Sequence, residues 1–362
     1  MTTTDDTRHM AAAVALAERG RGRTAPNPNV GCVLVRDGRV VGRGWTQPGG
    51  RPHAEAMALA QAGDAARGAT AYVTLEPCAH ESPRGPACAD LLIAAGVARV
   101  VASLRDPDPR TDGAGLARLA AAGVAVENGL LADAARRSMA GWLTRRKQAR
   151  PFVTLKLATS LDGCIALASG DSRWITGPEA RAHAHGERSR HEAILVGRGT
   201  WETDRPALDV RLAGLEDRSP ARVVLSYRHP RESGGPSREN TAQLDRREMG
   251  PRLRGDDGVR GTRDLIWVSS PAQIASLPGD HLLVEGGART AAAFLRADLV
   301  DRLLLYRAPI LIGGGLPSLT DIGMTALPET HGRWRLHDAR QLGVDRLEVY
   351  ERTPCSPESS PT

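Results

Sequence analysis

The sequence has 362 residues, enough for two domains that each bury a hydrophobic core. Its hydrophobic content of 41% and charged content of 25% are typical of a soluble globular protein, and no apolar run approaches the ~20 residues that a membrane span requires. Aromatic residues make up only 3%, which argues against a base-stacking surface for nucleic acid, whereas the net charge of +6 favours an anionic partner such as a phosphorylated small molecule.

The amino terminus, residues 1–6, lacks the basic start of a signal peptide, so we expect a cytoplasmic protein with no membrane partner. The sequence contains five cysteines: Cys32, Cys78, Cys88, Cys164 and Cys355. An odd, small number in a reducing compartment favours metal ligands and free thiols over a disulfide framework.

The first half of the sequence alternates between helical and extended patterns. We expect a helix over 8–19, a hairpin of 31–35 and 39–42, a helix whose first turn holds Pro52 and which runs to 62, a strand over 70–75, a helix over 88–95, a strand over 97–104, a helix over 115–122 and a strand over 124–126. Asp37-Gly38 predicts a type I′ turn in the hairpin. This alternation predicts an α/β sheet layered by helices.

Four residues of this half form the pattern of a zinc deaminase. His53 and Glu55 lie at a predicted helix start, Cys78 follows a proline after a strand, and Cys88 begins the next helix. One imidazole and two thiolates hold zinc and leave one position for water, while an unligated carboxylate moves protons. We therefore predict His53, Cys78 and Cys88 as zinc ligands and Glu55 as the catalytic acid and base.

Two further residues near this pattern keep two readings each, and a third has one. His80 is either a fourth ligand of a structural zinc or, as we favour, a residue of the substrate pocket. Asn27 either lines the pocket or forms an ordinary Asn-Pro turn. Cys32 lies in an apolar strand and is expected in the core.

The pattern restarts after a basic segment, 145–151, which reads as a linker. We expect strands at 152–158, 193–196, 222–226, 265–268, 282–284, 302–306 and 346–350. Thr176 and Glu179 read as a capping box that opens a helix. Residues 228–264 and the tail 354–362 lack apolar periodicity, so we predict a disordered insertion and a disordered tail.

These segments together resemble the bifunctional riboflavin-biosynthesis deaminase-reductase family, over nearly the whole sequence apart from the insertion and the tail. The matching motifs lie at 25–31, 52–55 and 74–80 in the first half, and at 155–156, 160–163, 169–176, 197, 200 and 284–287 in the second. The resemblance implies a cytidine-deaminase-like three-layer domain over 1–146 and a dihydrofolate-reductase-like domain over 151–353. It also implies a homo-oligomer that acts on phosphorylated pyrimidines, with one Zn²⁺ and NADPH, and that binds no nucleic acid.

The same resemblance implies the residues of the reductase half. The substrate residues are Ser172, Arg188, Leu208, Arg211 and Glu285; the nucleotide residues are Ala158, Trp174, Thr200, Asp204, Gly287, Ala288, Arg289, Thr290, Ala291, Ala292 and Ala293. The two arginines suit a phosphate, and a glycine-rich turn before a helix offers N–H groups to the cofactor's phosphates. Lys156, one of only two lysines in the sequence, either contacts substrate or extends along its strand.

The sequence departs from the family's pattern at a few positions. The loop before Cys88 is one residue longer, and Thr46 stands where a histidine is usual. Cys164, Arg205 and Ser226 replace usual residues of the reductase half. They keep open an alternative in which a zinc deaminase carries an inactive reductase-like domain that only binds nucleotide or holds a dimer.

Overall fold

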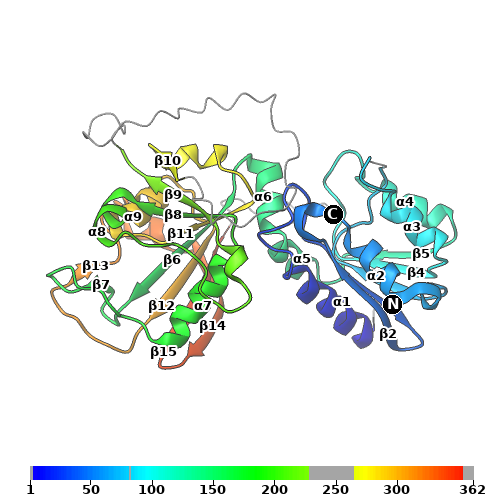
Figure 1. Cartoon of the computed structure of the whole chain (residues 1–362), viewed down its shortest axis with the longest axis horizontal. Helices are drawn as coiled ribbons and strands as arrows, with labels where there is room; N and C mark the ends of the chain where they lie inside the picture. The colour runs from blue at the N-terminus through cyan, green and yellow to red at the C-terminus, as the bar shows by residue number, and fades with distance from the viewer. Residues whose placement is uncertain (1–2, 81–82, 228–264, 354–362) are drawn as a thin grey trace, which may run out of the picture.

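The computed structural model describes residues 3–80, 83–227 and 265–353, so the predicted disordered insertion and tail lie outside the described residues. Figure 1 shows two lobes, each built on its own sheet. In the first lobe the strand order is β2-β1-β3-β4-β5, where β1 pairs antiparallel with β2 and β3, and β3, β4 and β5 are parallel. The strands are β1 (Gly31–Arg36), β2 (Arg39–Trp45), β3 (Thr70–Val73), β4 (Arg99–Ala102) and β5 (Ala125–Asn128).

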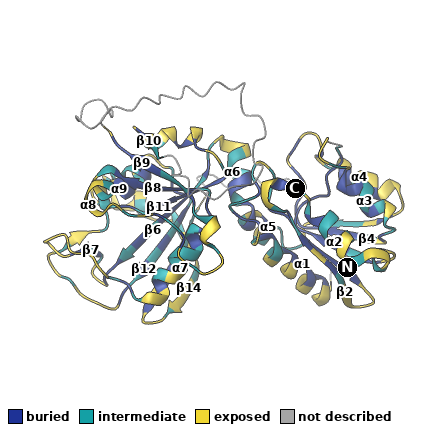
Figure 2. Cartoon of the chain, in the orientation of Figure 1, coloured by how far each residue is buried: buried dark blue, intermediate teal, exposed yellow. Residues whose placement is uncertain are grey.

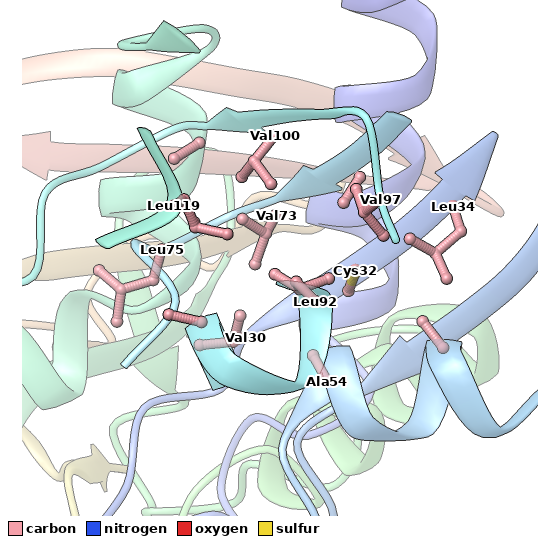
Figure 3. Packing of buried hydrophobic residues seen from close by; sticks show 14 of the residues in the cluster. Val30, Cys32, Leu34, Ala54, Val73, Leu75, Leu92, Val97, Val100 and Leu119 are labelled. Carbon is pink, nitrogen blue, oxygen red and sulfur yellow. The ribbon is translucent and has the colours of Figure 1, made fainter. Parts of the chain in front are cut away.

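Helices cover both faces of this sheet, because side chains alternate between the faces of a strand. Cys32 and Leu34 of β1 pack in a cluster with residues of the second, third and fourth helices, whereas Val33 and Val35 pack against the first. The helices are α1 (Thr4–Ala17), α2 (Ala54–Ala62), α3 (Cys88–Ala94), α4 (Ala114–Ala121), α5 (Ala132–Ser138) and α6 (Ala140–Gln148). The expected three-layer domain is confirmed, and Figure 3 shows Cys32 inside its core.

The second lobe contains a larger sheet, of order β10-β9-β8-β11-β6-β12-β15-β14. The neighbouring strands β10, β9, β8, β11, β6 and β12 all run parallel to one another. At one edge, β15 pairs antiparallel with β12, and β14 pairs antiparallel with β15. Their bounds are β6 (Phe152–Thr159), β8 (Ala193–Gly197), β9 (Ala221–Leu225), β10 (Ile266–Val268), β11 (His281–Val284), β12 (Arg302–Arg307), β14 (Trp334–Leu342) and β15 (Asp345–Arg352). A separate pair joins β7 (Cys164–Ala166) to β13 (Leu316–Pro317). Figure 2 shows buried central strands beneath more exposed helices.

The helices of this lobe are α7 (Pro178–Arg188), α8 (Arg198–Asp204) and α9 (Ala288–Arg296). Leu155 of β6 belongs to the main core, which includes Phe294 of α9, whereas Ala158 and Tyr306 pack with Ala180 of α7 on the opposite face. By the same alternation, Lys156 lies on the face that α7 covers. No helix among the described residues is both long and apolar enough to span a membrane.

Two local predictions are wrong and one is confirmed. Asp37 and Gly38 both adopt positive φ, 51° and 71°, as a type I′ turn requires. Pro52 lies outside α2, whose N-cap is His53, because a fixed φ near −65° suits an extended segment as well as a first helical turn. The capping box at Thr176 does not form: Gly177 is the N-cap of α7, and its N–H donates to Asp345 Oδ2 at 2.6 Å.

Candidate functional site

The three predicted zinc ligands converge in the first lobe. His53, Cys78 and Cys88 offer ligand atoms that all lie within 4.8 Å of one another. The Nδ1 of His53 lies 3.3 Å from Cys88 Sγ and 3.7 Å from Cys78 Sγ. Tetrahedral zinc bonded to nitrogen and sulfur separates its ligands by about 3.6–3.8 Å, so the donor set fits a zinc ion with little adjustment.

Two of the ligands come from helix starts and the third comes from a loop. His53 is the N-cap of α2, Cys88 is the first residue of α3, and Cys78 lies in the loop after β3. The backbone N–H of Cys88 donates to Cys78 Sγ at 3.3 Å. Hydrogen bonding from Cys88, together with His53, holds the pKa of the Cys78 thiol well below its usual range, which favours the thiolate that binds metal.

Glu55 lies in the first turn of α2, is buried at 3% exposure, and lines the same cavity as His53 and Cys78. Burial raises the pKa of its carboxyl to about 7, although His53 opposes the shift. A carboxyl that titrates near neutrality both accepts and donates a proton readily. It is absent from the group of residues whose atoms could hold a metal together, as expected for an unligated acid and base.

Asn27 and His80 also line this cavity. The Asn27 amide lies 3.2 Å from His53 Nε2, and its Nδ2 donates to the carbonyl of Gly50 at 2.8 Å. His80 lies 3.3 Å from Thr111 Oγ1 and outside the ligand group, in agreement with a pocket residue rather than a fourth ligand.

Sequence reasoning gave Glu76 no role, yet it organises one wall of the cavity. Its buried carboxylate accepts four backbone N–H groups, from Asp106 (3.1 Å), Gly113 (2.9 Å), Gly115 (2.9 Å) and Leu116 (3.1 Å). The donors lie 30 to 40 residues along the chain from Glu76, so no local pattern signals the contact.

The loop that Glu76 holds brings Asp106, Asp108 and Arg110 to the cavity. Burial raises the pKa of Asp106 to about 6. Arg110 instead holds the pKa of Asp108 well below its usual range through a paired hydrogen bond, from Nε at 3.0 Å and Nη2 at 2.6 Å. The wall therefore presents one carboxyl that titrates near pH 6 and one that stays ionised.

In the second lobe the structure brings Lys156, Glu285 and Arg188 together. Arg188 donates to both carboxylate oxygens of Glu285, from Nε at 2.7 Å and Nη2 at 2.8 Å. Burial opposes ionisation of Glu285, but Arg188 and Lys156 outweigh it and lower the pKa to about 2, while burial lowers the pKa of Lys156. The Lys156 Nζ lies 5.7 Å from the centre of the Tyr306 ring. Arg188 is thus engaged with Glu285.

The other substrate residues of the family pattern are more scattered. Arg211 is exposed, with its Nε 3.5 Å from Asp209 Oδ1, while the Asp209 carbonyl accepts from Arg188 Nη1 at 2.9 Å. Leu208 is buried with φ of 53°, and Ser172 is exposed.

The nucleotide residues lie on several elements. Ala158 is in β6, Thr200 and exposed Asp204 are in α8, and Trp174 is 66% exposed. Gly287 is the N-cap of α9, and its N–H donates to Thr200 Oγ1 at 3.4 Å. The remaining five are Arg289, Thr290, Ala291, Ala292 and Ala293, which follow Ala288 in the first turns of α9. The predicted glycine turn before a helix is therefore present.

Family models and relatives match both lobes. Residues 3–104 match the cytidine and deoxycytidylate deaminase zinc-binding region, and residues 151–347 match the RibD C-terminal domain. The riboflavin biosynthesis protein RibD of Escherichia coli (strain K12) is 41% identical over 362 residues, covering 94% of this chain and 97% of that protein. RibD of Aquifex aeolicus (strain VF5) is 37% identical over 360 residues, covering 96% and 98%.

Solved structures give the same result. A diaminohydroxyphosphoribosylaminopyrimidine deaminase/5-amino-6-(5-phosphoribosylamino)uracil reductase from Thermotoga maritima has a TM-score of 0.79 at 32% identity, over 96% of this chain and 99% of that one. Acinetobacter baumannii RibD, form 1, has a TM-score of 0.77 at 35% identity, over 97% and 99%.

Proposed function

Since the chain belongs to the RibD family of bifunctional riboflavin-biosynthesis proteins, we propose that it catalyses two consecutive steps on a phosphorylated pyrimidine. The first removes the 2-amino group of 2,5-diamino-6-(5-phosphoribosylamino)pyrimidin-4(3H)-one. The second reduces the ribosyl group of 5-amino-6-(5-phosphoribosylamino)uracil to ribityl, with NADPH as the hydride donor. The deaminase domain extends over 1–146 and the reductase domain over 151–353.

The observation that carries the first step is the cluster of His53, Cys78 and Cys88 beside the buried carboxyl of Glu55. Zinc held by these three residues would supply an activated water at neutral pH. Glu55 takes a proton from that water and delivers one to the departing amine, which leaves as ammonia while oxygen replaces nitrogen on the ring carbon. A pKa of about 7 suits both transfers.

The second step is supported by the charged group of Lys156, Arg188 and Glu285. Reduction adds a hydride to C1 of the ribosyl unit, breaks the bond between C1 and the ring oxygen, and requires a proton at that oxygen. Lys156 is our candidate for the proton donor, because burial lowers its pKa and so eases loss of the proton. Glu285 and Arg188 hold each other in one geometry beside it.

Two finer points complete the proposal. A homo-oligomer is supported by β14, an edge strand whose residues are mostly exposed, and light scattering would test it. A cytoplasmic location is supported by the free thiols of the four described cysteines, and cell fractionation would test it.

A two-step product assay tests the function with reciprocal variants. Glu55→Gln should abolish ammonia release while zinc stays bound and NADPH oxidation with the deaminated intermediate continues. Lys156→Met should have the opposite effect, abolishing NADPH oxidation and sparing ammonia release. Loss of zinc from Glu55→Gln would make Glu55 a ligand, and a wild-type protein that never oxidises NADPH with the intermediate would favour a reductase-like domain that only binds nucleotide or holds a dimer.

A further inference from the structure

Helix α6 contributes side chains to both lobes from neighbouring positions. Arg145 donates to main-chain carbonyls of the second lobe, to Ala275 at 3.0 Å, Leu277 at 2.8 Å and Gly279 at 3.1 Å. The next residue, Arg146, lines the deaminase cavity that holds Glu55 and the ligands His53 and Cys78. The helix is therefore anchored to the reductase lobe while it forms part of the deaminase pocket.

Arg146 is held in the pocket by two contacts. Its Nη2 donates to Asp108 Oδ2 at 3.1 Å, and its guanidinium lies 5.3 Å from the centre of the Trp142 ring. Within the described ranges this is the one hydrogen bond that Arg146 makes, so Nε and Nη1 remain available to a ligand. Its side chain is 43% exposed, which gives a ligand in the cavity access to it.

Two arginines of the cavity wall contact Asp108, which carries a single negative charge. Arg110 already engages this carboxylate through two hydrogen bonds, from Nε and Nη2, and the Asp108 side chain is only 6% exposed. Arg146 therefore adds a second guanidinium to a carboxylate that Arg110 neutralises. An anion can take up the free face of Arg146 without leaving Asp108 unpaired.

Two other arginines also line the cavity. Arg84 donates to the carbonyl of Gly49 at 2.8 Å, and Arg51 lies two residues before the ligand His53 in the sequence. Neither lies over an aromatic ring within the part of the chain that the structure describes. Arg146 is thus the arginine whose position is fixed in advance by a ring and a carboxylate, which lowers the entropic cost of binding.

We infer that Arg146 is a specificity-determining residue of the deaminase site, which binds the phosphate of its phosphoribosyl substrate through a guanidinium supplied by the helix that joins the two lobes. The inference rests on the proposed function, because that function gives the substrate its phosphate. Planar guanidinium groups bind phosphate in a forked geometry, so arginine suits this role better than lysine.

The test compares one substrate with and without its phosphate, using the full-length, zinc-loaded protein. Arg146→Met should raise the KM for ammonia release from the phosphorylated pyrimidine about 10- to 100-fold, the loss expected for a charged hydrogen bond. The KM for the dephosphorylated riboside should change less than about 2-fold. Arg146→Lys should fall between wild type and Arg146→Met, and it keeps the test valid should the methionine variant fold poorly.

Lys147→Met is the matched control, because it removes one positive charge from the adjacent, exposed position of the same helix. It should leave both KM values unchanged. If Arg146→Met raises the KM equally for both substrates, the inference is overturned in favour of a purely structural role beside Asp108. If Arg51→Met abolishes the difference in KM between the two substrates and Arg146→Met does not, the phosphate is assigned to Arg51 instead.

Calorimetric titration with inorganic phosphate separates this inference from the proposed function. Wild-type protein should bind one more phosphate than Arg146→Met, whichever pyrimidine the enzyme deaminates. Equal stoichiometry in the two proteins would overturn the inference even if the proposed deamination takes place.

Discussion

Replacement of Glu76 by glutamine tests whether one buried carboxylate holds the wall of the deaminase pocket. Each carboxylate oxygen accepts two backbone N–H groups, Oε2 from Asp106 and Gly113, and Oε1 from Gly115 and Leu116. The first turn of α4, which contains Gly115 and Leu116, fits closely: a Cβ at Gly115 would lie 1.9 Å from the carbonyl oxygen of Pro77. The four amides therefore have little freedom to find other acceptors.

The expected cost follows from the chemistry of the amide. Glutamine keeps one oxygen, which still serves two of the N–H groups, but turns an NH₂ donor toward the other two. Each buried N–H that loses its acceptor costs about 1–3 kcal/mol, so Glu76→Gln should destabilise the loop by about 2–6 kcal/mol. That is a large share of the roughly 5–15 kcal/mol that stabilises a typical domain.

Amide hydrogen exchange is the assay, because a two-domain chain need not unfold in one step. The amides of Gly113, Gly115 and Leu116 should exchange at least about 30-fold faster in Glu76→Gln, which corresponds to about 2 kcal/mol. The KM for deamination should rise, since the loop carries Asp106 and Asp108 into the cavity. Glu329→Gln, at an exposed position, should change neither quantity. Unchanged exchange at the three amides in Glu76→Gln would refute the reasoning.

Two further predictions concern the contact between the lobes. Arg21 Nη2 lies 2.9 Å from Glu187 Oε2 in a buried ion pair, so Glu187→Gln should lower the free energy of chemical unfolding by about 3–5 kcal/mol. The double variant Arg21→Met, Glu187→Met should recover much of this loss, because it leaves neither charge buried and unpaired. Equal stability of Glu187→Gln and wild type would contradict the prediction. Burial, followed by the charge of Arg21, lowers the pKa of His191 from 6.5 to about 3, so the unfolded chain binds more protons between these values. The stability from His191 is complete above pH 6.5 and falls by about 2 kcal/mol at pH 5, and urea unfolding of His191→Gln should show a shallower pH dependence than wild type.

The parts of the site that the sequence predicts are those whose signal is local. His53, Cys78 and Cys88 each lie at a helix start or a proline turn, positions that short patterns reveal, and the Asp37-Gly38 turn follows from residues that tolerate positive φ. The three residues converge because both helix starts open at the same edge of the sheet. The spacing of these three residues along the chain was therefore sufficient to predict the metal cluster.

The parts that it does not predict depend on distant partners. The role of Glu76 depends on amides up to 40 residues away, and Arg146 acquires its position from Asp108 and Trp142. At Thr176 the local capping pattern was outweighed by a tertiary contact, because the Asp345 carboxylate accepts from the N-cap of α7. A capping hydrogen bond requires a geometry that residue types alone do not impose.

The contact between the lobes links residues that adjoin both sites. On α7, Glu187 pairs with Arg21 of the first lobe, whereas its neighbour Arg188 pairs with Glu285 in the reductase site. Gly22 packs so closely on the second lobe that a Cβ would lie 2.6 Å from the carbonyl carbon of Arg190, and the segment continues into Asn27, which contacts His53. Separating the lobes would break the ion pair between Arg21 and Glu187. It would also move the segment that leads to Asn27 in the first site and the helix that carries Arg188 in the second. The two activities are therefore held in a fixed relation by a contact that costs free energy to break.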